Sequence, residues 1–237
     1  MRGARAYAVS EESGRPGRQD ESAPTRGMSR EERAPTRAWV RLYSGKRLDL
    51  LNPTPFDWED CDLAMGLART YRWGGYSRWE LPLSVAQHSL FVLALRRRWS
   101  PDVDDPRADL RELLHDADEG LLGFDCISVV KPFLGERFRA LTASLERAVA
   151  LRYGLAPWTP AQWRPHKRAD RIAAASEAVH VVGWTAREVR ATLRIPHSPL
   201  ELDPLAAIYG GTPWEPWAPT LAAERFLAEL RALCARL

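Results

Sequence analysis

Cysteine and long apolar runs are both scarce in this chain of 237 residues. The three cysteines, Cys61, Cys126 and Cys234, lie far apart and form no CxxC pair, which argues against a disulfide framework and a thiolate zinc site. No segment approaches the roughly 20 uncharged apolar residues of a membrane-spanning helix, and no apolar segment typical of a signal peptide follows the initial MRGAR. We therefore expect a soluble, cytoplasmic protein with reduced cysteines and no membrane partner.

An excess of charge of one sign is also lacking. The chain has 34 Lys and Arg residues against 31 Asp and Glu residues, and the two signs are interleaved. The basic residues are mostly arginine, since lysine is limited to Lys46, Lys131 and Lys167. Ten tryptophans are scattered among apolar positions without a clustered basic stripe, so we predict that they anchor the core and loops. This pattern argues against a nucleic-acid partner.

The first 37 residues combine Arg, Glu, Ser, Pro and Gly with almost no branched or aromatic apolar residues. Such a composition cannot offset the entropy lost on ordering, so residues 1–37 are predicted to form a disordered tail. Met28 is a candidate for the true start. A folded domain over residues 38–237 begins near Trp39 with a short extended segment and a Ser44-Gly45 turn.

The rest of the chain shows helical periodicity, and no segment alternates apolar and polar residues long enough for a sheet. With 45% hydrophobic residues, the domain can bury one sizeable core. We predict an all-α bundle of about six helices. A Pro-, Gly- and Trp-rich segment, 195–219, is predicted to be a long ordered loop. The predicted helices span residues 58–70, 84–99, 107–119, 132–153, 165–182 and 220–237.

Four residues are candidates for metal coordination: His88 in SVAQHS, the adjacent His115 and Asp116 in LLHDADE, and Asp170 in KRADR. Imidazole nitrogens and carboxylate oxygens bind divalent zinc, manganese, iron and cobalt well. Each candidate lies in an apolar or small-residue stretch and would face the bundle interior, where an unpaired carboxylate is costly. A single such histidine is more often a core residue, but two His and two Asp together predict a metal site.

With these residues in place, the sequence resembles the HD-domain superfamily of metal-dependent phosphohydrolases, whose signature is a His, a later His-Asp pair and a still later Asp on helices. The resemblance covers residues 42–182 and is strongest toward bacterial 5'-deoxynucleotidases. Five segments carry it in the family's order, namely YSGKRLDLLNP, RWGGYSRW, LSVAQHS, LLHDADEGLLG and KRADR.

The resemblance implies a role for each matching residue. Glu119, one helical turn after Asp116, would be the general base for a water bound to the metal. The substrate phosphate and nucleoside would be held by a basic, an aromatic and an acidic group, because an Arg fork fits phosphate oxygens and an indole face fits a base or sugar. The implied metal ligands are His88, His115, Asp116 and Asp170, and the implied substrate residues are Arg72, Trp73, Asp125 and Lys131.

The implied activity is removal of phosphate from a nucleotide, with a (deoxy)nucleoside 5'-monophosphate favoured, by attack of water bound to one divalent ion (Mn, Co, Zn, Fe or Mg). Alternatives are a hydrolase of deoxynucleoside triphosphates or cyclic dinucleotides, and a non-catalytic nucleotide-binding module. Tyr76 replaces a family histidine, and Phe124 separates Gly123 from Asp125, so the substrate pocket differs from that of close relatives. A homodimer is expected from the resemblance alone.

Several candidates also have plain structural interpretations. Trp73 is as well placed in a core as in a binding site, and Lys131 could be a solvated loop residue before Pro132. Glu177 follows Asp170 by seven residues on a similar helix face, which favours a salt-bridge partner over a ligand. The remaining histidines lack any partner pattern and are predicted to be structural or exposed. They are His166, His180 and His197.

Overall fold

The computed structural model describes residues 38–100, 104–127 and 130–237. The predicted disordered tail and the alternative start at Met28 lie outside these residues. The described part is all-α, as predicted, with one small β-hairpin. In this hairpin β1 (Trp39–Arg41) pairs antiparallel with β2 (Arg47–Asp49), with Val40 opposite Leu48. The predicted turn joins the two strands, and Gly45 adopts φ +91°, a left-handed conformation that suits glycine.

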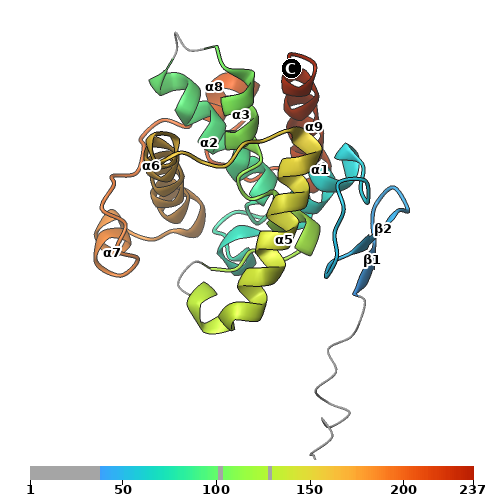
Figure 1. The fold of residues 1–237 in the computed structure, drawn as a ribbon. Coiled ribbons are helices and arrows are strands. Elements are labelled where there is room, and N and C mark those ends of the chain that lie inside the picture. Colours follow the sequence, from blue (N-terminus) through green and yellow to red (C-terminus); the bar gives the residue numbers. More distant parts are fainter. Residues whose placement is uncertain (1–37, 101–103, 128–129) are drawn as a thin grey trace, which may run out of the picture. The chain divides into compact units, whose positions relative to one another are not determined.

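The described residues contain nine α-helices, more than the six predicted (Figure 1). Short 3₁₀ turns at Arg72–Gly75 and Lys131–Leu134 and a π-helical turn at Ala178–Val182 complete the helical structure. The α-helices are α1 (Asp60–Arg69), α2 (Val85–Trp99), α3 (Pro106–Leu113), α4 (Ala117–Leu122), α5 (Gly135–Tyr153), α6 (Pro160–Glu177), α7 (Ala186–Ala191), α8 (Pro204–Tyr209) and α9 (Pro219–Cys234).

The helix predicted over 107–119 is in fact two helices. The chain leaves helical geometry at Leu114 (φ −99°, ψ 12°) and Asp116 (φ −114°, ψ 24°), between α3 and α4. The break falls on the His-Asp pair and sets these side chains at the junction of two short helices. Apolar residues continue at helical spacing across the junction, so the sequence pattern gave no sign of it.

The helix predicted to start at Pro165 begins five residues earlier. Thr159 caps α6: its hydroxyl accepts a hydrogen bond from the Gln162 backbone N–H, and the Gln162 side chain in turn accepts from the Thr159 backbone N–H. Pro160 occupies the first helical turn, where a missing N–H costs nothing. Pro165 lies inside the helix, and the carbonyl that it leaves unpaired belongs to exposed Ala161, which water can reach.

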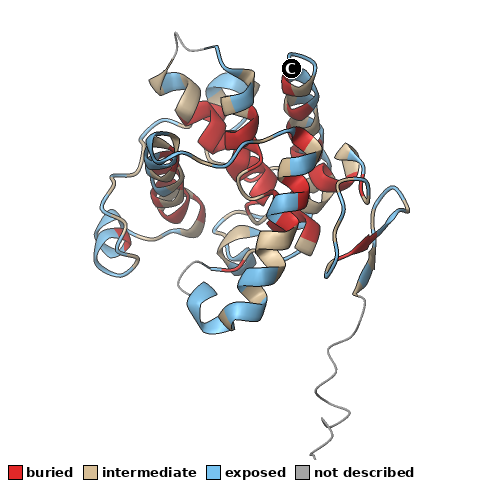
Figure 2. Cartoon of the chain, viewed as in Figure 1, coloured by how far each residue is buried: buried red, intermediate tan, exposed pale blue. Residues whose placement is uncertain are grey.

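Helix α2 lies at the centre of the core. It packs against α1, α3, α6, α8 and α9, and it is buried along most of its length (Figures 1 and 2). The predicted loop 195–219 contains α8, and the Gln87 side chain is one of its contacts with α2. The Gln87 amide donates to the Glu215 carbonyl over 3.0 Å and accepts from the Trp217 backbone N–H over 2.8 Å. Polar groups in the buried part of α2, residues 85–95, are therefore shielded from water on nearly all sides.

Helices α1 and α4 cross in close contact at two glycines. A Cβ atom on Gly66 would lie 2.2 Å from the Gly120 carbonyl oxygen, and one on Gly120 would lie 2.5 Å from Leu67 Cγ. Only glycine fits at either position. This crossing holds α4, and with it the residues that follow the His-Asp pair, against the body of the domain.

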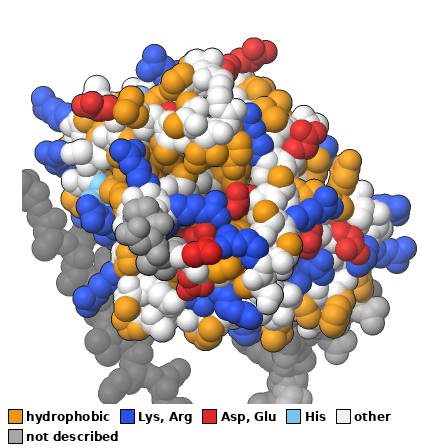
Figure 3. Space-filling model, turned by 90° about the horizontal axis from the view of Figure 1, so that it is seen from above, with side chains coloured by type: hydrophobic (Ala, Val, Ile, Leu, Met, Phe, Trp, Pro, Cys, Tyr) orange, Lys and Arg blue, Asp and Glu red, His pale blue; other side chains and the backbone are white. Residues whose placement is uncertain are grey.

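The outside of the domain carries both signs of charge. On the face drawn in Figure 3, basic and acidic side chains are interspersed with apolar ones, as the near balance of the composition predicts. None of the described helices combines the length and apolar character needed to cross a membrane.

Candidate metal centre and adjoining cavity

Three segments bring the four predicted ligands together. His88 lies on α2 and is fully buried, His115 and Asp116 lie at the α3–α4 junction, and Asp170 lies on α6. The two imidazole Nε2 atoms are 3.3 Å apart, and Asp116 Oδ2 lies 3.1 Å from His115 Nε2 and 3.7 Å from His88 Nε2. These three side chains, which we call the metal group, lie close enough together to hold a metal ion.

The spacing within this group fits a single ion. Ligand atoms about 2.0–2.2 Å from a tetrahedral ion lie about 3.3–3.6 Å from each other, and the three atoms are separated by 3.1, 3.3 and 3.7 Å. Two imidazoles facing one another through Nε2 need a cation or a proton between them, because both nitrogens cannot be lone-pair acceptors at that distance. The donor set of nitrogen and carboxylate oxygen suits a borderline divalent ion such as Zn²⁺, Mn²⁺ or Fe²⁺.

Asp170 lies at the edge of this group. Its Oδ1 is 3.5 Å from His88 Nε2, while its Oδ2 pairs with Lys167 on the preceding turn of α6. The structure therefore brings the fourth predicted ligand next to the group but outside the three-residue set whose atoms are all mutually close.

A buried carboxylate, Glu177, connects the metal group to two substrate candidates. Glu177 is 1% exposed at the end of α6, and its Oε1 lies 2.5 Å from His88 Nδ1. Its Oε2 accepts hydrogen bonds from Arg72 Nε at 2.9 Å and from Trp73 Nε1 at 3.1 Å. Glu177 is thus a salt-bridge partner, and its hydrogen bond to Nδ1 orients the ring of His88 so that Nε2 faces the other ligands.

The site is rich in negative charge. Burial and the Arg72 charge both oppose protonation of His88, but Glu177 and Asp170 outweigh them and raise the pKa of His88 to about 9. Burial raises the pKa of Asp116, but His115 and His88 together bring it well below its usual range. Arg72 and His88 likewise overcome burial and lower the pKa of Glu177 to about 2. Without a metal ion, positive charge at this position must come from protons, which is the condition under which a cation binds well.

Glu119, the predicted general base, lies in the first turn of α4 and is buried. Its Oε1 accepts a hydrogen bond from Lys131 Nζ at 3.2 Å, and its Oε2 has no hydrogen-bond partner among the described residues. Burial, followed by the nearby charges of Asp116 and Asp125, raises the pKa of Glu119 to about 9. An orphaned buried oxygen beside several carboxylates fits a site that receives a cation, because the cation would lower this pKa again.

The predicted substrate residues lie on two sides of the metal group. Arg72 NH1 is 3.7 Å from Asp116 Oδ2, so its guanidinium borders the group directly. Trp73 adopts φ +58°, a strained conformation for a bulky residue, and its hydrogen bond to Glu177 fixes the indole there. Lys131 contacts Glu119, and Asp125 is partly buried and close enough to Arg72 to raise the pKa of that guanidinium.

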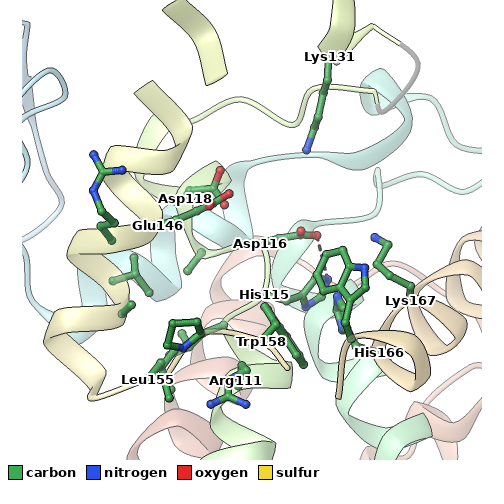
Figure 4. A pocket seen from close by; sticks show the side chains of 18 residues that line it. Arg111, His115, Asp116, Asp118, Lys131, Glu146, Leu155, Trp158, His166 and Lys167 are labelled. Carbon is green, nitrogen blue, oxygen red and sulfur yellow. Dashed lines mark ion pairs between the residues drawn. The ribbon is translucent and has the colours of Figure 1, made fainter. Parts of the chain in front are cut away.

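A cavity of about 550 Å³ opens beside the metal group (Figure 4). His115 and Asp116 form its inner end, and Lys131 and Lys167 point into it from different sides. Its size is typical of a site for a small organic molecule. Trp158 supplies an aromatic wall and stacks on His166 with ring centroids 4.5 Å apart.

His166, Trp158 and Asp118 were not among the predicted site residues. His166 Nδ1 lies 2.8 Å from Glu112 Oε2, and its ring packs against that of His115, with centroids 4.9 Å apart. Asp118 lines the cavity, and burial, followed by the charges of Asp116 and Glu146, raises its pKa to about 7. In the sequence, the one feature that pointed to a role for Asp118 in the site was its position two residues after the His-Asp pair.

Comparisons with known proteins place the chain in a family. An uncharacterized protein of Rhodobacter capsulatus is 44% identical to it over 153 residues, which cover 64% of this chain and 77% of that protein. This chain belongs to the same family. No family model matches it. The resemblance to HD-domain phosphohydrolases therefore stays a prediction from the motifs.

Proposed function

We propose that this protein is a metal-dependent phosphohydrolase of the HD type that removes phosphate from a (deoxy)nucleoside 5'-monophosphate. One observation carries the proposal: His88, His115 and Asp116, from two separate parts of the chain, converge within 3.1–3.7 Å of each other, and His115 and Asp116 also line a cavity. The order of these residues and of Asp170 in the sequence matches the metal ligands of that superfamily.

The surrounding cations fit a phosphate group. Arg72 is held beside Asp116 by its ion pair with Glu177, so its free guanidinium nitrogens can bind phosphate oxygens without losing side-chain entropy on substrate binding. Lys131 and Lys167 add positive charge at the cavity. When bound, a divalent ion supplies a Lewis acid for the phosphoryl oxygens and lowers the pKa of a coordinated water. Positioning and charge neutralisation by these groups would account for most of the rate.

Glu119 is the residue best placed to move a proton. Its Oε2 is free of hydrogen bonds from the described residues, while Lys131 holds Oε1 in a fixed position. With cationic charge at the neighbouring group, Glu119 would ionise and could accept the proton of the attacking water. The same group could then return the proton to the leaving alkoxide.

A single phosphate is favoured over three by the charge of the cavity. Its lining includes the carboxyl groups of Asp118 and Glu146 beyond the metal group. These would repel additional phosphates but would accept hydrogen bonds from a neutral sugar or base. A monophosphate that keeps its charged end at the cations satisfies both parts of the cavity.

The test is phosphate release by chelator-treated protein resupplied with Mn²⁺, Co²⁺, Zn²⁺ or Mg²⁺. The substrates are nucleoside mono- and triphosphates and a cyclic dinucleotide. We expect metal-dependent orthophosphate from a monophosphate, absent in Asp116→Ala and retained in Glu224→Gln, which changes an exposed carboxylate on α9. Tripolyphosphate from a triphosphate, or a linear product from the cyclic dinucleotide, would assign the site to those substrates instead. No product despite bound metal would identify a non-catalytic binding module.

A further inference from the structure

The cavity has an acidic recess, formed by Asp118 and Glu146, that takes no part in the proposed transfer of phosphate to water. Asp118 is on α4, and Glu146 is on α5. Figure 4 draws their carboxyl groups close together on the cavity wall. The recess is distinct from the metal group, because neither residue belongs to the set of side chains able to hold an ion.

Asp118 is a largely buried group in this recess. It is 7% exposed and lines the cavity. Its carboxyl group accepts a hydrogen bond from its own backbone N–H, and none joins it to another residue in the described part of the chain. Buried carboxylates are normally paired with a cation or with several N–H donors, because leaving them unpaired costs free energy. A largely buried carboxyl group on a cavity wall, with no partner from another described residue, is suited to accept hydrogen bonds from a ligand.

The walls around the recess restrict what that ligand group can be. Leu114, Val149 and Leu155 are apolar, and the Trp158 indole lines the same cavity. A flat, largely apolar ring with hydrogen-bond donors on one edge satisfies both features. A bare metal ion would meet only the two carboxylates and no third ligand.

We propose that the Asp118–Glu146 recess binds the exocyclic amino group of a nucleobase, so that the enzyme prefers nucleotides of adenine, cytosine or guanine. The inference rests on the proposed function, because it places the base of a nucleotide whose phosphate lies at the metal group. Carboxylates accept well from such amino groups, as in the recognition of cytosine N4 by Asp and Glu. A base without the amino group would leave the buried carboxylate unpaired, and this is the condition under which a site discriminates strongly.

The experiment compares deoxyadenosine and deoxycytidine 5'-monophosphates with the matched analogues in which hydrogen replaces the amino group. Binding to chelator-treated protein is measured by calorimetry, so that no turnover occurs, and kcat/KM is measured with metal. We expect at least about tenfold weaker binding and lower kcat/KM for the analogues. The ratio of kcat/KM for the amino nucleotide to kcat/KM for its analogue should fall toward one in Asp118→Asn. Glu146→Gln should reduce this ratio less, and Glu224→Gln should leave it unchanged.

The outcomes separate the two proposals. Two results would overturn the recess assignment and leave the phosphohydrolase proposal intact. One is hydrolysis by the wild-type protein with nearly equal kcat/KM for the amino nucleotides and their analogues. The other is a ratio of these kcat/KM values that is unchanged in a folded Asp118→Asn variant. Calorimetric discrimination without hydrolysis of any nucleotide would support the recess and reject the hydrolase. Binding of Mn²⁺ that is lost in Asp118→Asn but kept in Asp116→Asn would mean that the recess is a cation site instead.

Discussion

At the scale of single residues, Glu177 is the side chain on which most site geometry depends. Its carboxylate accepts hydrogen bonds from His88 Nδ1, Arg72 Nε and Trp73 Nε1 over 2.5–3.1 Å, and the residue is 1% exposed. A hydrogen bond from a metal-binding imidazole to a carboxylate fixes the orientation of the ring and increases its basicity. The same carboxylate sets the direction of the guanidinium that borders Asp116.

Replacement of this carboxylate by an amide should weaken metal binding. In Glu177→Gln we expect roughly 10–100-fold lower affinity for Mn²⁺ or Zn²⁺, because the amide is a weaker acceptor for His88 Nδ1–H. Competition against a chromophoric chelator measures the affinity, and circular dichroism confirms that the variant folds. Glu177→Asp should recover part of the affinity, whereas a purely structural role would not distinguish the two variants. Unchanged affinity in folded Glu177→Gln would exclude the positioning role.

The metal group could be predicted from the sequence because the types of its residues and their order along the chain are sufficient to indicate it. His88, His115 and Asp116 are rare residue types in apolar surroundings, and such side chains must converge to be stable. Asp118 and His166 could not be recognised in the same way. Their importance depends on which helix faces which across the cavity, and no residue pattern within one helix contains that information.

At the scale of secondary structure elements, the crossing of α1 and α4 controls the position of Glu119. We expect Gly66→Ala to destabilise the domain by about 1–3 kcal/mol, because its Cβ would lie 2.2 Å from the backbone oxygen of Gly120, which cannot rotate away. Urea unfolding measures the change. The exposed Glu224→Ala control on α9 should stay within about 0.5 kcal/mol of the wild type. A Gly66→Ala variant as stable as that control would show that the helices separate easily.

The existence of most helices was predictable, but their ends were not. Apolar spacing identified α1, α2, α5 and α9, because each buries a stripe of its own residues. The same spacing ran across the break at residues 114–116, where tertiary packing places the His-Asp pair. The start of α6 depended on the Thr159 capping box, a stronger signal than the internal Pro165. Helices α7 and α8, of six residues each, are too short to show a period.

At the scale of the whole domain, the metal group is a junction between parts of the chain far apart in sequence. His88 comes from the central helix and the His-Asp pair from the α3–α4 break, so one ion would link these two parts of the core, with Asp170 of α6 beside them. The unfolded chain has no such preformed site. Binding to the folded state alone therefore adds its free energy to the stability of the domain.

This linkage predicts a metal-dependent melting temperature. An ion present at about 100 times its Kd stabilises the folded state by about 2.7 kcal/mol, and for a domain of 150–250 residues each kcal/mol raises Tm by roughly 2–4 °C. We therefore expect Mn²⁺ or Zn²⁺ to raise Tm by about 5–11 °C over chelator-treated protein in differential scanning calorimetry. The increase should largely vanish in Asp116→Asn and persist in Glu224→Gln. An equal increase in all three proteins would mean that the ion binds elsewhere, because Asp116→Asn neutralises a carboxylate whose Oδ2 lies within 3.7 Å of both histidines and Glu224→Gln does not change the site.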